Sequence, residues 1–145
     1  MINEKANSLI YKEDNLKIGF GLLDNENYLV MLGSRYIEVE KKDSVYMSLL
    51  PLLQLDISLF KSTIENKGYD FLQIVPVEKI LLTAFSDGGS FFWKEKGLVW
   101  IEKLKYAPPA IISMLIEKSS TESELPKDFK FKIKKVLKKI TFKNI

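Results

Sequence analysis

Eight lysines and three phenylalanines lie in the last nineteen residues of the chain, where the sole acidic residue is Asp128. Lysines at this density neutralise phosphate groups, and an aromatic ring among them can stack on an unpaired base. A helix over residues 127–140 places apolar and basic side chains on opposite faces. Its apolar face holds Phe129, Ile133, Val136, Leu137 and Ile140, and its basic face holds Lys127, Lys130, Lys134, Lys135, Lys138 and Lys139.

Phe131 falls in the middle of this basic face, where a core on the opposite side cannot cover it. The simplest interpretation is a helix with one docked face and one solvated face. A second hypothesis is a surface that binds single-stranded nucleic acid without sequence preference. Its residues would be Lys127, Phe131, Lys134, Lys135, Lys138 and Lys139. A basic amphipathic helix on an anionic membrane is a third hypothesis. The alternation in "FKFKI" also allows a strand that turns Phe129, Phe131 and Ile133 inward together.

The chain contains neither histidine nor cysteine. Histidine is the commonest general base near neutral pH, and both residue types are the usual ligands of zinc. Mechanisms that use a Ser-His-Asp or a Cys-His arrangement are therefore excluded. We expect a protein that is not an enzyme and that holds no metal or other cofactor.

Two short polar loops contain residue types that occur in ion sites. The loop "DNEN" at 24–27 offers oxygen ligands, but it lacks the twelve-residue span and the terminal glutamate of an EF-hand. We interpret it as a hairpin turn. The loop "SDGGS" at 86–90 precedes a predicted helix and could present N–H groups to an anion, although Asp87 would repel a phosphate. We interpret it as a connector between two helices.

Charge is distributed unevenly along the chain. The overall formal net charge is +3, but residues 126–145 carry eight lysines against one aspartate, so residues 1–125 have a net charge of −4. Arg35 is the one arginine among 22 basic residues, which argues against sequence-specific reading of nucleic acid. The N-terminus has no secretory signal pattern, and the apolar run at 45–55 is too short to span a bilayer. We expect a cytoplasmic protein without a membrane span.

The order of predicted elements is strands first and helices afterwards, which is typical of an α+β fold. Alternation and turn residues predict an antiparallel β-meander of three to four strands, at 16–23, 28–32 and 35–42, with an edge strand near 8–12. About five helices follow, while residues 69–75 are expected to be extended. The helix that begins near Asp43 should end or kink before Pro51. Residues 90–104 fit a helix capped by Ser90 better than a hairpin. We expect a single domain over 1–145, with a β-rich portion at 1–42 and a mainly helical portion at 43–145.

The segment at 76–104 resembles small bacterial proteins of the toxin-immunity type. In the shared pattern, a helix ends in a small-residue loop, and a second helix follows that begins Ser-x-x-Trp and contains another tryptophan. The resemblance covers about 30 residues, and Lys96 and Gly97 stand where an alanine or a leucine is expected. It is carried by Pro76, Leu81, Leu82, Ser90, Trp93, Trp100, Ile101 and Glu102.

The resemblance implies an immunity or inhibitor protein that neutralises a cognate toxin by direct binding and needs no catalytic residues. The acidic body is compatible with a cationic partner such as a nuclease. Tyr36, Glu38 and Glu40 alternate with Ile37 and Val39, so the third strand should expose one acidic face of the sheet. Because aromatics beside charges are usual at interfaces, we take these three residues as the candidate contacts with a protein partner.

Overall fold

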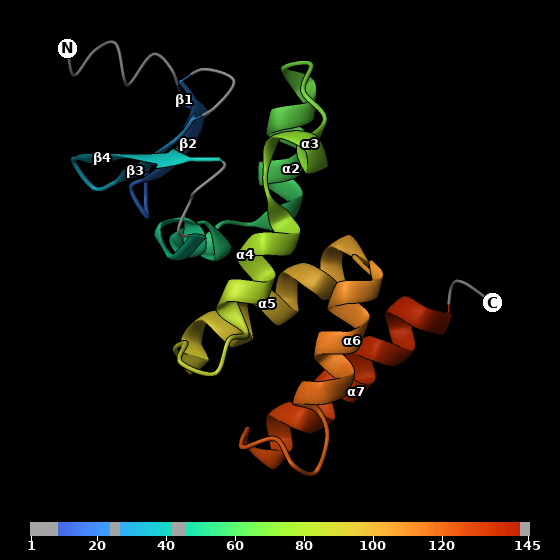
Figure 1. Cartoon of the computed structure of the whole chain (residues 1–145). Coiled ribbons are helices and arrows are strands. Elements are labelled where there is room, and N and C mark those ends of the chain that lie inside the picture. The colour runs from blue at the N-terminus through green and yellow to red at the C-terminus, as the bar shows by residue number, and fades with distance from the viewer. Residues whose placement is uncertain (1–8, 24–26, 42–45, 143–145) are drawn as a thin grey trace. The chain divides into compact units, whose positions relative to one another are not determined.

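The computed structural model describes residues 9–23, 27–41 and 46–142 (Figure 1). The fold is α+β, and a four-stranded antiparallel sheet precedes the helices, as predicted. The chain divides into two compact units, residues 1–80 and 81–145. Unit 1 extends beyond the sheet because the helices that follow it pack on the strands.

The sheet is a meander in which each strand pairs with the next one along the chain. Its strands are β1 (Leu9–Glu13), β2 (Ile18–Leu22), β3 (Asn27–Leu32) and β4 (Arg35–Glu40). The pairing of β1 with β2 shifts register between Leu9 and Tyr11, opposite Gly21 and Phe20. A Cβ atom on Gly19 would lie only 3.1 Å from the Leu9 side chain, so glycine allows the close approach at this bulge.

Unit 1 has an aromatic core centred on Phe60. Phe60 lies on α2 (Ile57–Asn66), which begins at the N-cap Asp56. The Phe60 ring centroid lies 4.9 Å from that of Tyr11 on β1, 6.0 Å from that of Phe20 on β2 and 5.3 Å from that of Phe71. Strands that are distant in sequence from α2 are therefore joined to it through one side chain.

Two local predictions in unit 1 are wrong. A 3-10 helix, η1 (Tyr46–Gln54), continues through Pro51 instead of ending before it. Leucines on both sides of the proline are buried, and this burial outweighs the missing backbone donor. Residues 71–74 form a short helix, α3 (Phe71–Ile74), rather than an extended segment. The Asp70 carboxylate caps it, and Phe71 is buried against Phe60.

Unit 2 is helical. It contains the end of α4 (Val77–Ala84), followed by α5 (Phe91–Leu104), α6 (Pro109–Lys118) and α7 (Lys127–Phe142). The helix at 90–104 is confirmed, with the Ser90 hydroxyl accepting from the Phe92 N–H at 3.2 Å. Trp100 of α5 is fully buried, while Trp93, one turn from the start, is half-buried.

Gly97 allows α5 to approach the end of α4 closely. A Cβ atom at this position would lie 3.2 Å from the Phe85 ring and 3.3 Å from the Leu81 side chain. Glycine inside a helix costs about 1 kcal/mol relative to alanine, so its presence here indicates that close packing matters more than helix propensity.

Gly97→Val is expected to lower the free energy of unfolding by about 1–3 kcal/mol, because a larger side chain must displace Phe85 or Leu81. Urea denaturation measures the change. Gly88→Val is the control, since nothing lies within 4 Å of a Cβ at Gly88. Equal unfolding midpoints for the two variants would contradict this account of Gly97.

Candidate functional site

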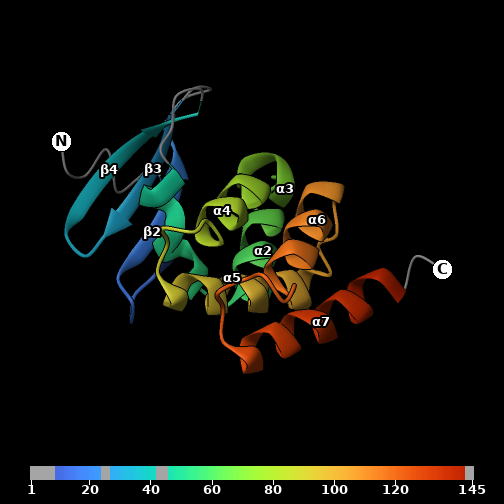
Figure 2. The ribbon, with the colours of Figure 1, turned by 60° about the horizontal axis from the view of Figure 1, so that its bottom comes forward.

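The predicted apolar face of the C-terminal helix is confirmed. Phe129, Ile133, Val136 and Ile140 of α7 are buried, and Leu137 is half-buried. The Phe129 ring centroid lies 4.9 Å from that of Phe91 and 6.3 Å from that of Phe85. Figure 2 shows α7 beside α5 and α6. Because residues 127–142 are helical, the alternative of a strand at "FKFKI" is wrong.

The opposite face of α7 is exposed and basic, as predicted. Phe131 is 59% exposed, and the Lys135 ammonium lies 4.7 Å from the centroid of its ring. We call Lys127, Lys134, Lys135 and Lys138 the lysine stripe, because all four lie within about 60° of Phe131 around the helix axis. Lys139 lies outside the stripe and pairs with Glu102 of α5 at 2.5 Å.

The three candidate contacts on the sheet lie on β4, at its edge. Glu38 and Glu40 are exposed, and Tyr36 is half-buried. Glu38 pairs with Leu29 and Tyr36 pairs with Met31, and both of these β3 residues are buried. Glu38 and Glu40 are thus exposed on the edge strand, whereas the β3 residues that pair with Glu38 and Tyr36 are covered.

The outer face of α5 carries exposed apolar side chains that the sequence did not single out. Phe92 and Val99, which lie two turns apart, are each 43% exposed. The Lys96 ammonium lies 5.4 Å from the centroid of the Phe92 ring, and the Trp93 ring lies 4.8 Å from the same centroid. We call Phe92, Lys96 and Val99 the α5 patch. Its signal in the sequence is the seven-residue spacing of Phe92 and Val99 on the side opposite Gly97 and Ile101, which are buried.

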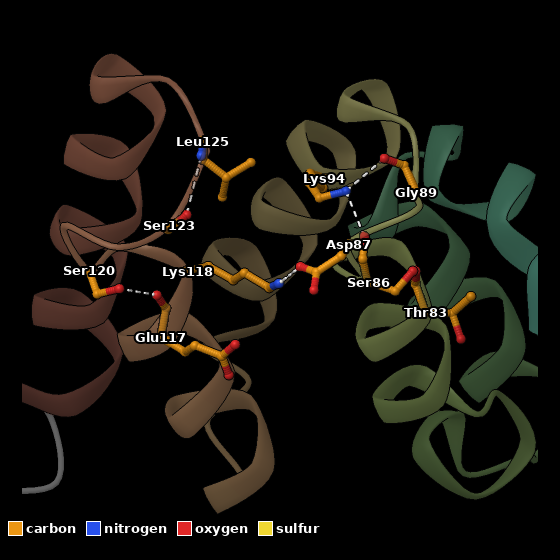
Figure 3. A network of polar contacts seen from close by, with 10 residues as sticks. All are labelled: Thr83, Ser86, Asp87, Gly89, Lys94, Glu117, Lys118, Ser120, Ser123 and Leu125. Atoms are coloured by element: carbon orange, nitrogen blue, oxygen red, sulfur yellow. Dashed lines mark hydrogen bonds and ion pairs between the residues drawn. The ribbon is translucent and has the colours of Figure 1, made fainter.

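The loop between α4 and α5 is held by a buried lysine (Figure 3). Lys94 is 4% exposed, and its ammonium donates to the carbonyl oxygens of Ser86 at 2.9 Å and Gly89 at 2.8 Å. Burial lowers the pKa of Lys94, the charge of Lys118 lowers it further, and the charge of Asp87 opposes both effects. Lys94 thus fixes the backbone of the loop through two of its carbonyl oxygens. The loop connects α4 to α5, as expected for "SDGGS".

Asp87 joins this loop to α6. Its carboxylate accepts from the Lys118 ammonium at 2.5 Å, and Figure 3 shows the two side chains pointing toward each other. The hydrogen bond and charge of Lys118 lower the pKa of Asp87. A pocket of about 590 Å³ lies here, lined by residues of the loop and by Glu117, Lys118 and residues 120–125. Both of its lysines already have partners in the protein.

In the three described ranges, no group of three or more acidic residues lies close enough together to hold a metal ion. Residues 24–26 of the "DNEN" loop lie outside the described residues. Among the helices the structure describes, none is both long enough and apolar enough to cross a membrane.

No protein-family model matches the chain, and neither the curated proteins nor the solved structures give a match.

Proposed function

We propose that the chain is a non-enzymatic protein-binding module that inhibits a bacterial toxin by direct binding in the cytoplasm. The observation that carries this proposal is the α5 patch, in which Phe92 and Val99 are each 43% exposed on a charged helix. Aromatic side chains are enriched at protein interfaces, where a few buried anchors supply most of the binding energy.

The surroundings of the α5 patch suit an interface. Glu95 and Lys103 lie on the same side of α5 and are exposed, so the patch has a polar rim. Phe91, at the start of the helix, is also partly exposed, but its ring packs against Phe129 of α7 and lies outside the patch. An apolar centre with a charged rim is the usual anatomy of a protein interface.

The resemblance of residues 76–104 to toxin-immunity proteins supplies the role of inhibitor. The same segment contains α5, in which Ser90 is the N-cap and Trp100 is buried. On this proposal, the motif residues fix the helix and the α5 patch contacts the toxin. Glu38 and Glu40 on β4 offer a second, acidic surface for a cationic partner.

The test uses the product of the gene directly upstream in the host, which is where the toxin of an immunity protein is encoded. Binding is measured with the purified full-length chain, and growth rescue is measured in cells that express both proteins. Phe92→Ala combined with Val99→Ala is expected to weaken binding by about tenfold or more and to abolish rescue. Lack of binding by the natural chain would refute the inhibitor role.

A matched control is Ile116→Ala on α6, because Ile116 is 58% exposed and lies outside the α5 patch. It is expected to leave both affinity and rescue unchanged. Glu38→Lys combined with Glu40→Lys should slow association with a cationic partner more than it speeds dissociation. Loss of affinity in the Ile116 variant alone would place the interface elsewhere.

A further inference from the structure

The lysine stripe on α7 has a surplus of positive charge that the protein itself does not neutralise. Within the described part of the chain, no carboxylate pairs with Lys127, Lys134 or Lys138. Unit 2 as a whole has thirteen lysines against seven acidic residues, whereas unit 1 has nine basic residues against twelve acidic ones. The surplus is therefore concentrated in one unit, and α7 contributes more than half of its lysines.

We infer that the lysine stripe and Phe131 form a binding surface for single-stranded nucleic acid. Lysine ammonium groups neutralise phosphates, and the release of counterions drives such binding. Phe131 stands at the centre of the stripe with 59% of its surface exposed, so one face of an unpaired base can stack on it. This surface lies on α7 and is separate from the α5 patch.

The burial of α7 favours nucleic acid over a membrane. A helix that binds in the plane of a membrane inserts a broad apolar face between the lipid headgroups. In α7, that face is already buried inside unit 2 through Phe129, Ile133, Val136 and Ile140. Among the residues of α7 whose burial is described, Phe131 is the one large apolar side chain that is exposed. A single ring gives little insertion, but it is sufficient for stacking.

Phe131 also favours a single strand over a duplex, because the base faces of a duplex are covered by their neighbours. The stripe has lysines and no arginine, so we expect little preference for base sequence. From Lys127 to Lys138 the stripe extends about 16 Å along the helix, enough for roughly five phosphates at stacked spacing.

The test is filter binding of the full-length chain to a radiolabelled oligothymidylate of about 12 nucleotides, which is a simple probe for stacking and phosphate contacts. Binding should weaken as salt rises, with a slope of log K against log salt of about −3 for four phosphate contacts. Phe131→Ala should weaken binding to this strand by about fivefold or more. The same variant should leave the weaker binding to a duplex unchanged.

Charge reversal locates the site. Lys134→Glu combined with Lys138→Glu is expected to weaken binding by about tenfold or more and to flatten the salt dependence. Lys12→Glu combined with Lys105→Glu is the matched control, since it changes the net charge of the chain equally at exposed positions outside α7 and outside the α5 patch. Circular dichroism verifies that both double variants remain folded.

Three results would overturn the inference. Equal loss in the stripe variant and in the control would show attraction by net charge without a site. An unchanged affinity of the Phe131 variant for the single strand would remove the stacking contact. Binding to phosphatidylserine vesicles, without binding to the oligonucleotide, would assign α7 to a membrane surface.

Discussion

Phe129→Ala is expected to lower the free energy of unfolding by about 3–5 kcal/mol, which is the usual cost of removing a buried aromatic side chain. Phe129 is buried, and its ring contacts Phe85 and Phe91, so α7 loses its aromatic contact with the loop before α5 and with α5. Chemical denaturation followed by circular dichroism measures the loss.

Phe131→Ala provides a matched control on the same helix, two residues away. Its ring is exposed, so its removal is expected to change the free energy of unfolding by no more than about 0.5 kcal/mol. The two variants thus separate the structural face of α7 from the face proposed to bind nucleic acid. Similar destabilisation by both would mean that Phe131 is packed in solution, which would contradict its assignment to a binding surface.

Phe60→Ala is expected to have a comparable effect in unit 1, again about 3–5 kcal/mol. Phe60 contacts Tyr11, Phe20 and Phe71, and aromatic pairs contribute beyond the area they bury. Removing the ring leaves a cavity between β1, β2, α2 and α3. The unfolding midpoint in urea should fall accordingly.

The neighbouring residue supplies the control for Phe60. Leu59 lies on the same helix and is 56% exposed, so Leu59→Ala is expected to cost no more than about 0.5 kcal/mol. A small effect of Phe60→Ala, similar to that of Leu59→Ala, would show that the aromatic cluster does not hold α2 on the sheet.

The features that were predicted from the sequence depend on local chemistry. The two faces of α7 follow from a helical period, and Ser90 is an N-cap that acts within one turn. The four-stranded meander follows from alternation and turn residues, such as Gly33 with φ +66° between β3 and β4.

The features that were missed depend on contacts between distant segments. Whether Leu29 is buried is decided by what covers the sheet, and alternation along β4 carries no information about that. Lys94 is a charged residue in a charged stretch, and its burial depends on two carbonyl oxygens in the preceding loop. Phe92 and Val99 were not singled out, because exposed and buried apolar side chains look alike in a sequence.

Both tryptophans of the chain, Trp93 and Trp100, lie on α5 and therefore belong to unit 2. Indole emission is consequently an intrinsic optical reporter of unit 2, and it should shift to longer wavelength when the buried Trp100 meets water. Five of the six tyrosines belong to unit 1, so tyrosine absorbance reports largely on that unit. Phe60→Ala and Phe129→Ala can thus be followed unit by unit without any added label.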